Sequence, residues 1–205
     1  MRRIIFICVL AAFVAWPVAA QERPGAGRIE VSAIPAGGIF FGSSSTGTEP
    51  NFGNYTVAGA FGWNFNRWIG VEGEAGGALG IKQSVDFNGE ALTSQRTPHL
   101  FTYNANAVFN PFGNDRPFVP YVTSGVGGMR MLDTESVANL GITAPTNYFT
   151  ANVGGGLKWF ANRHWGARGD YRLMIVNDNV NAPGFFGREE IRYGHRVYGG
   201  LLFTY

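Results

Sequence analysis

Residues 147–174 read NYFTANVGGGLKWF, ANRH and WGARGDYRLM, two alternating segments around a four-residue connection. In residues 165–174, Gly166, Arg168, Asp170 and Arg172 alternate with Trp165, Ala167, Gly169, Tyr171 and Leu173. In residues 147–160, Tyr148, Thr150, Asn152, Gly154, Gly156 and Lys158 alternate with Phe149, Ala151, Val153, Leu157 and Trp159. A period of two belongs to a β-strand whose two faces meet different surroundings. The stretch therefore predicts two antiparallel strands joined by a tight turn.

The same kind of pattern extends outward over most of the chain. Eight strand-like segments are predicted, at residues 28–41, 55–65, 68–77, 98–109, 118–131, 147–160, 165–174 and 191–205. Their connections alternate in length: 66–67, 110–117 and 161–164 are short, whereas 42–54, 78–97, 132–146 and 175–190 are long. In an antiparallel sheet this alternation puts every short connection at one end. The sequence therefore predicts an all-β fold, an eight-stranded antiparallel up-and-down barrel.

The residues of the polar face distinguish a membrane barrel from a soluble one. A soluble, lipocalin-like barrel has the same period with inside and outside exchanged, and its wet face is normally rich in Lys and Glu. Here the polar face is small and amide-rich, as in Thr102, Asn104 and Asn106. The segments also match the roughly 9–11 residues that a tilted strand needs to cross a bilayer. We therefore favour a transmembrane barrel with short periplasmic turns and long extracellular loops.

Aromatic residues gather beside the short connections. Every tryptophan after residue 20 flanks one of two short turns, and Phe65, Phe109, Phe112, Phe118 and Phe160 lie at the same end. Tryptophan prefers the headgroup zone of a membrane, where its ring and its N–H are both accommodated. The core of a soluble sandwich is the alternative, but it would spread its rings along the strands. The predicted aromatic belt consists of Trp63, Trp68, Trp159 and Trp165.

The first 20 residues have the plan of a secretory signal peptide. Arg2 and Arg3 precede an apolar run, and small residues end it before Gln21. We expect a periplasmic lead at residues 21–27 and the barrel domain at 28–205. Cys8, the only cysteine, lies in the signal, so the mature chain offers no disulfide or thiolate chemistry. Without Arg2 and Arg3 the remaining basic residues equal the 14 acidic ones, which argues against a nucleic-acid partner.

The last ten residues, RVYGGLLFTY, end on an aromatic side chain. This segment resembles the C-terminal assembly signal of outer-membrane proteins. Residues 165–172 are similar to the penultimate strand of the small eight-stranded barrels typified by OmpX, the opacity proteins and the transmembrane half of OmpA. The resemblance implies a porin-like cell-envelope protein of the bacterial outer membrane, in contact with outer-membrane lipid and lipopolysaccharide. It also implies that the barrel-assembly machinery reads Leu201, Phe203 and Tyr205.

Charged residues lie on the face that we predict to line the interior. They are Glu30, Glu72, Glu74, Lys158, Arg168, Asp170, Arg172 and Arg196. An eight-stranded barrel is just wide enough inside to be filled by side chains, and unpaired charges there are costly. We therefore expect Glu72 and Glu74 to neutralise Arg168 and Arg172 in a structural ion network. Carboxylates two positions apart can also serve acid–base chemistry, and a narrow conductance remains a further reading.

No catalytic, cofactor or metal site is predicted. His99, His164 and His195 are scattered and lack metal-ligand spacing. The outer-membrane lipid A deacylases use a histidine two residues before a serine, and none of the three histidines has a serine at that position. The Asn and Asp residues at 177–181 resemble a loose calcium site but are more typical of a turn. The chain is therefore expected not to be an enzyme.

The leading functional hypothesis is a structural or surface-interaction protein that displays its loops. A small-solute or ion pore is the alternative, and a lipid-modifying enzyme is a weaker one. Ser44, Asn88, Asn139 and Asn179 are expected outside the cell, and Asn66, Asn114 and Asn162 in the periplasm. Candidate contacts for an unknown extracellular ligand are Val85, Leu92, Ile142, Phe185 and Phe186.

The facing of residues 118–131 is ambiguous from the sequence. If Arg130 points inward, the remaining alternation divides the segment between two faces. Val122, Ser124, Val126 and Gly128 then lie inside, and Tyr121, Thr123 and Met129 lie outside. The aromatic positions also allow a bulge in this segment.

Overall fold

The computed structural model describes residues 29–42, 50–87, 90–132, 146–182, 186–188 and 190–205. The predicted signal peptide and lead lie outside these residues, as do Ser44, Asn88, Asn139, Ile142 and Phe185. No helix in the described part of the chain is long and apolar enough to span a membrane. The strands are β1 (Ile29–Phe41), β2 (Phe52–Asn64), β3 (Ile69–Gly80), β4 (Lys82–Phe87), β5 (Glu90–Arg96), β6 (His99–Phe109), β7 (Phe118–Leu132), β8 (Thr146–Phe160), β9 (Trp165–Val176) and β10 (Arg192–Thr204).

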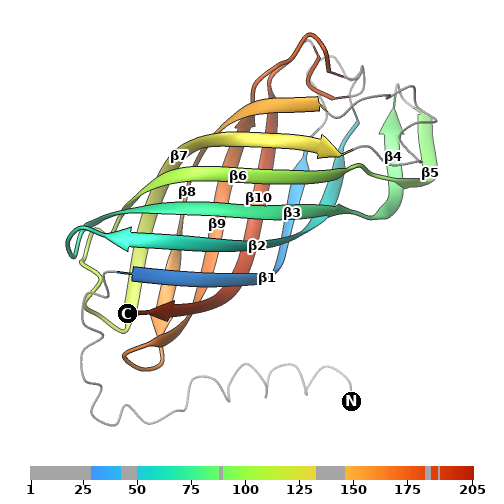
Figure 1. Cartoon of the computed structure of the whole chain (residues 1–205). Helices are drawn as coiled ribbons and strands as arrows, with labels where there is room; N and C mark the ends of the chain where they lie inside the picture. The colour runs from blue at the N-terminus through green and yellow to red at the C-terminus, as the bar shows by residue number, and fades with distance from the viewer. Residues whose placement is uncertain (1–28, 43–49, 88–89, 133–145, 183–185, 189) are drawn as a thin grey trace, which may run out of the picture.

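Eight of these strands close into one barrel (Figure 1). Their order around the wall is β1-β10-β9-β8-β7-β6-β3-β2, and neighbouring strands are antiparallel. Because β1 pairs with both β2 and β10, the wall has no free edge that would present unpaired backbone groups to lipid. The predicted eight-stranded antiparallel up-and-down barrel is confirmed.

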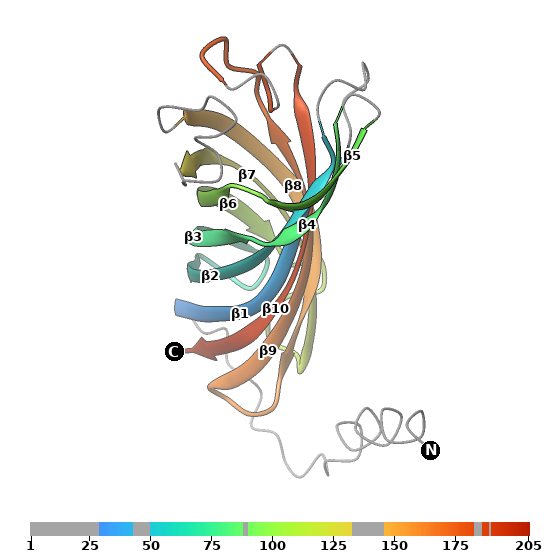
Figure 2. The same cartoon turned by 90° about the vertical axis from the view of Figure 1, so that its right-hand side faces the viewer.

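The short turns lie at one end of the barrel together with the C-terminus, whereas β4 and β5 project beyond the other end (Figures 1 and 2). Two of the turns are stabilised by the same hydrogen-bond pattern, in which an asparagine side chain accepts from two backbone N–H groups. The Oδ1 atom of Asn66 accepts hydrogen bonds from the backbone N–H groups of Trp68 and Ile69, at 2.8 and 2.9 Å. Asn162 does the same for His164 and Trp165, at 2.9 Å each. An asparagine side chain thus fixes each reversal, as in an Asx turn.

The sequence predicted residues 78–97 to be a plain loop, but they contain the two-stranded sheet β4–β5. Gln83 ties the base of this hairpin to β2, because its amide accepts a hydrogen bond from Gly53 N at 3.1 Å and donates one to Gly53 O at 2.6 Å. The hydroxyl of Thr97 donates to Asn54 Oδ1 at 2.5 Å. The sequence signal that we missed is Asn88-Gly89, a pair typical of two-residue hairpin turns.

Strand β7 resolves the ambiguity of residues 118–131 against the arrangement in which Arg130 points inward. Tyr121, Thr123 and Met129 are buried inside, whereas Val122 and Val126 are each 52% exposed on the outer wall. Ser124 and Arg130 also lie on the exposed face. No register shift interrupts the pairing of β7 with β6 or β8, so the allowed bulge is absent from this strand.

The alternation alone left the facing open, and Arg130, whose charge suggested an inward position, is exposed on the outer wall. Arg130 is two residues from the extracellular end of β7, where a long side chain can reach the headgroup region. On the inner face, Gly125 and Gly127 leave room for the side chains of Asn106 and Asn104 from β6. Because glycine has no side chain, these two inner positions of β7 carry none of the polar groups that indicate an interior face on the other strands.

Replacing Gly127 with leucine should destabilise the barrel by about 1–3 kcal/mol, because the side chain would be forced into a packed interior. A Cβ atom at Gly127 would lie 2.0 Å from Tyr103 O and 2.6 Å from Asn104 Oδ1. The matched control, Val126→Leu, enlarges an outward side chain and should be nearly neutral. Urea unfolding in lipid vesicles measures both. If Gly127→Leu were tolerated and Val126→Leu were destabilising, β7 would have the alternative facing, with Val126 and Arg130 inside.

Strand β1 covers the predicted segment at residues 28–41, but its pairing is irregular in the middle. Its pairing shifts between Ala33 and Ala36 against β10, and between Ile34 and Gly38 against β2. Pro35 lies in both intervals and has no N–H to donate to a neighbouring strand. The hydroxyl of Tyr55 on β2 donates to Pro35 O and thereby links the two strands at this irregularity.

Candidate functional site

The middle of the lumen is filled by an ion network built from strands on opposite sides of the barrel. Glu72 on β3 accepts from Arg168 Nη1 at 2.5 Å and from Arg172 Nη2 at 2.7 Å, both on β9. Asp170, between the two arginines on β9, accepts from Arg168 Nη2 at 2.8 Å and from Arg172 Nε at 3.0 Å. The carboxylates therefore hold both guanidinium groups across the full width of the lumen.

A second carboxylate on β3 extends the network. Glu74 contacts Arg196 Nη2 at 2.7 Å and Arg172 Nη1 at 3.4 Å, and it accepts a hydrogen bond from the Tyr198 hydroxyl at 2.6 Å. The Tyr198 ring lies 5.0 Å from the guanidinium carbon of Arg196 and 5.5 Å from that of Arg172. Stacking and ion pairing together compensate these arginines for lost hydration.

A separate pair lies nearer the periplasmic end. Lys158 Nζ on β8 contacts Glu30 Oε2 on β1 at 2.5 Å, and Asn64 Nδ2 donates to Glu30 Oε1 at 2.8 Å. Tyr121 separates this pair from Arg168, because its ring lies 5.0 Å from Lys158 Nζ and 5.4 Å from the Arg168 guanidinium carbon. The Tyr121 hydroxyl donates to Asp170 Oδ2. The structure thus brings all eight predicted interior charges into ion pairs, four carboxylates with four cations.

The sequence reasoning missed the tyrosines of this site. Tyr198 could have been found, because it lies two positions from Arg196 and so shares its face. Tyr121 falls on the outer face when Arg130 is pointed inward, and its polar partner, Asp170, lies on a strand remote in the sequence. Buried tyrosine hydroxyls usually need such a partner.

The part of the wall formed by β6 and β8 carries amides on its inner face. Asn152 Nδ2 on β8 donates to Asn106 Oδ1 at 3.0 Å and lies 3.4 Å from Asn104 Oδ1 on β6. Asn104 Nδ2, Asn106 Nδ2 and Asn152 Oδ1 are buried without a protein hydrogen-bond partner. This strip is therefore polar but uncharged.

An apolar cluster closes the extracellular mouth. Phe186, from the connection between β9 and β10, is 0% exposed, and its ring centroid lies 4.9 Å from Phe41, 5.7 Å from Phe52 and 5.5 Å from Tyr148. The Tyr148 hydroxyl donates to Phe186 O at 3.0 Å. Arg192 covers the ring at 5.0 Å and donates to Gly42 O at 2.6 Å and Pro50 O at 2.8 Å. Phe186 thus fills the mouth of the barrel as a plug.

The plug corrects one expectation about loop contacts. Phe186 and Val85 were candidate ligand contacts, but Phe186 is enclosed and Val85 is only 8% exposed. Phe186 was expected at the surface because it belongs to a long connection. Its burial could not be predicted, because the side chains that enclose it come from β1, β2 and β8. The backbone at Gly187 has a φ of +65°, and a Cβ there would lie 3.1 Å from Tyr148 Cε1, so glycine suits this bend.

A smaller apolar cluster closes the periplasmic end of the lumen. Val119, Phe160 and Leu202 pack together there and are at most 2% exposed. Phe160 was grouped with the aromatic residues near the membrane interface, but its ring points inward. The ion network therefore lies between apolar material at both ends.

The predicted belt residues lie near the periplasmic end of the wall. Trp63, Trp68 and Trp165 are 52%, 42% and 54% exposed, whereas Trp159 is partly buried. Of the predicted assembly signal, Leu201 and Tyr205 are exposed and Phe203 packs edge-on against Trp165 at 5.1 Å. Ile29 and Tyr205 exchange backbone hydrogen bonds at 2.9 and 3.1 Å where β1 meets β10. Recognition of these residues by an assembly machinery stays a prediction.

The histidines serve local contacts. His99 Nδ1 accepts from Gly80 N at 3.1 Å, and His195 Nδ1 lies 2.8 Å from the Tyr171 hydroxyl. Among the described residues no group of three or more His, Cys, Asp or Glu could hold a metal ion. Asn179 bonds Asn181 N and Asn147 O, as expected for a turn residue.

A closed barrel whose outer wall is apolar and whose lumen holds paired charges defines an integral outer-membrane barrel. The sequence matches the outer membrane protein beta-barrel domain family over residues 6–188, so the chain belongs to that family. Comparison with curated proteins gives no match.

Solved structures share the fold at low sequence identity. Neisserial surface protein A is 14% identical, with a TM-score of 0.62 over 88% of this chain and 99% of that chain. OprG of Pseudomonas aeruginosa is 14% identical, with a TM-score of 0.54 over 88% and 96%. Ail of Yersinia pestis is 11% identical, with a TM-score of 0.51 over 86% and 96%. The expected resemblance to small eight-stranded outer-membrane barrels is confirmed.

Proposed function

We propose that this protein is a non-conducting, non-enzymatic barrel that displays its extracellular segments at the cell surface. Residues 1–20 direct its export, and the barrel-assembly machinery inserts it. The observation that carries the proposal is the filling of the lumen at three levels: the Phe186 plug, the ion network and the cluster around Leu202. A transport protein would need a continuous polar path between the two ends.

Among the residues that the structure describes, the interior also lacks the arrangement that hydrolysis requires. The carboxylates of the network are all held by cations or by tyrosine hydroxyls, so none is positioned as a base beside a nucleophile. The filled lumen gives a substrate no route to them. A structural role for the ion pairs, which hold opposite walls of the barrel together, fits this geometry.

The charge of the long connections indicates what kind of partner they suit. They hold more acidic than basic residues: Glu49, Asp86, Glu90, Asp133, Glu135, Asp178, Glu189 and Glu190 against Lys82, Arg96 and Arg188. The structure of Ail contains a heparin analogue, sucrose octasulfate. A polyanion of that kind would be repelled by the acidic connections here, so we infer a neutral or cationic extracellular ligand.

The amide strip favours a second candidate, a narrow pore for water or small solutes. The amide atoms of Asn104, Asn106 and Asn152 that lack protein partners are suited to hold water along one wall. The apolar clusters at the mouth and at the periplasmic end interrupt this strip. Conductance would therefore require both ends to open.

Planar-bilayer recording tests the proposal. The purified wild-type barrel should give no discrete current steps, with detergent alone and the heat-unfolded protein as controls. Asn152→Leu, which would obstruct the amide strip, serves to identify a genuine pore. Current steps in the wild-type protein that disappear in Asn152→Leu would establish the pore and refute the proposal that the lumen does not conduct.

A further inference from the structure

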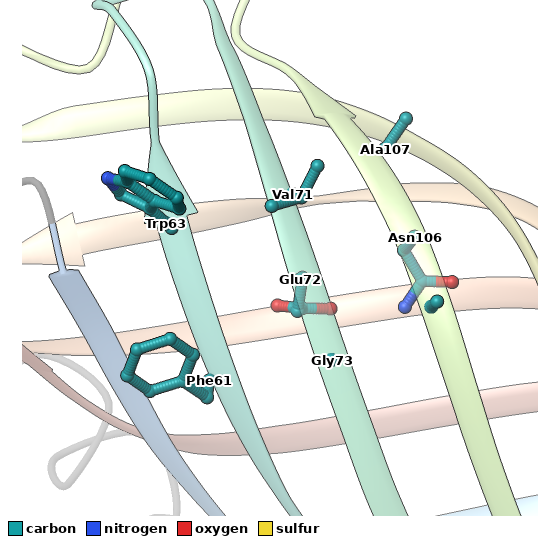
Figure 3. A pocket seen from close by; sticks show the side chains of 8 residues that line it. Phe61, Trp63, Val71, Glu72, Gly73, Asn106 and Ala107 are labelled. Carbon is teal, nitrogen blue, oxygen red and sulfur yellow. The ribbon is translucent and has the colours of Figure 1, made fainter.

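The outer wall contains a hollow in its periplasmic half (Figure 3). Its volume is about 380 Å³, and Phe61, Trp63, Val71, Gly73, Ala105 and Ala107 supply most of its lining. The strand register puts Phe61, Gly73 and Ala105 in one row and Trp63, Val71 and Ala107 in the next. The aromatic rings of β2 form one side, and the small residues of β3 and β6 form the floor.

Gly73 is the position that creates the hollow. A Cβ atom added there would meet no atom within 4 Å, so the space in front of it is open. Phe61 and Trp63 on β2 are 55% and 52% exposed, so their rings border this space from the lipid side of the wall. Because the wall faces hydrocarbon, an apolar chain rather than water must fill the hollow.

A cation lies at the foot of the hollow. Arg67 is exposed in the turn between β2 and β3, and its guanidinium carbon lies 4.0 Å from the centre of the Trp68 ring. Arg67 is equidistant in sequence from Trp63 and Val71, a separation of roughly 13 Å along an extended strand. That distance fits within the roughly 15 Å hydrocarbon depth of one leaflet.

We propose that this face is a specific site for a phospholipid of the periplasmic leaflet. One acyl chain fills the hollow against Gly73, and the phosphate binds Arg67, which Trp68 holds in place. Charge complementarity carries the assignment: the turns at this end hold Arg67, Arg116 and Arg163 against one acidic residue, Asp115. A second copy of the chain fits less well, because eight residues line the hollow and a stable interface uses about 20–30 residues a side.

Two substitutions test the two halves of the site. Gly73→Leu fills the hollow, and its matched control is Gly169→Leu on β9, where an added Cβ also meets nothing within 4 Å. Arg67→Gln removes the charge, and its control is Arg163→Gln in the other Asn-capped turn. Heat-modifiable migration on unboiled gels confirms that every variant is folded before binding is measured.

Lipid binding is measured by native mass spectrometry. The delipidated barrel is titrated with palmitoyl-oleoyl phosphatidylglycerol. The wild type and both controls should retain one lipid more tightly than Gly73→Leu and Arg67→Gln, each weakened by about tenfold. Dioleoylglycerol, which lacks the phosphate, should bind the wild type no better than Arg67→Gln binds phosphatidylglycerol.

The alternatives give different patterns. Equal retention by Gly73→Leu and Gly169→Leu would remove the hollow as a lipid site. Loss in Gly73→Leu with full retention in Arg67→Gln would overturn the phosphate contact and hence the phospholipid assignment. A dimer mass in the wild type that Gly73→Leu abolishes would assign the hollow to a second copy instead.

Discussion

Replacing Glu72 with alanine is expected to lower the free energy of unfolding by about 3–5 kcal/mol, because two buried arginines lose one of the two carboxylates that they share. Arg168 and Arg172 both contact Glu72 and are 3% and 0% exposed. Neither guanidinium can reach water through the filled lumen. The measurement is reversible urea unfolding in lipid vesicles.

A double-mutant cycle isolates the interaction. Glu72→Ala and Arg168→Met are made singly and together. Independent sites deviate from additivity by about 0.3–0.5 kcal/mol, and the coupling energy of this pair should be well above that. Ser124→Ala, on the lipid-facing side of β7, is the control and should be nearly silent. Strictly additive losses would mean that the two charges are solvated in a water-filled lumen. That result would contradict the proposal of a non-conducting barrel.

Replacing Phe186 with alanine should cost a similar amount, about 3–5 kcal/mol, if the ring is as enclosed as a core phenylalanine. Its contacts with Phe41, Phe52 and Tyr148 would be lost together. The connection that carries Phe186 should then become accessible to protease on intact cells. Midpoints of unfolding and cleavage rates measure the two effects.

The control for the plug is Phe40→Ala, the outward neighbour of Phe41. Phe40 is 54% exposed on the lipid side, so its loss should change stability little and leave the connection protected. Equal effects of the two substitutions would show that Phe186 adds no more than a surface ring, and the mouth would then be open.

The barrel itself could be predicted because two independent patterns agree. The period of two shows in almost every strand, and the alternation of long and short connections sorts the strand ends. On β3 and β9 the charges occupy one face alone, so Glu72, Glu74, Arg168 and Arg172 could be placed inside before their partners were known. A lumen that narrow leaves charged side chains little choice except to pair.

The sequence failed where facing depends on a distant strand. Tyr121 belongs inside because Asp170 accepts a hydrogen bond from its hydroxyl, and Gly127 belongs inside because Asn104 occupies the space in front of it. Neither contact leaves a local pattern in β7. Phe186 is similar, since a long connection shows no periodicity and its burial depends on side chains from three other strands.

The ion pairs and hydrogen bonds of the lumen also make closure of the sheet cooperative. Lys158 with Glu30, Arg168 with Glu72 and Tyr198 with Glu74 join residues 128, 96 and 124 positions apart. A partly assembled sheet that lacks its last strands would hold carboxylates of β1 and β3 in the bilayer with no cation to meet them, which is costly. Intermediates that lack β8, β9 and β10 are therefore unstable in lipid. The finished barrel, in turn, can release one strand only by uncovering charge, so a high barrier to unfolding follows from the network that fills it.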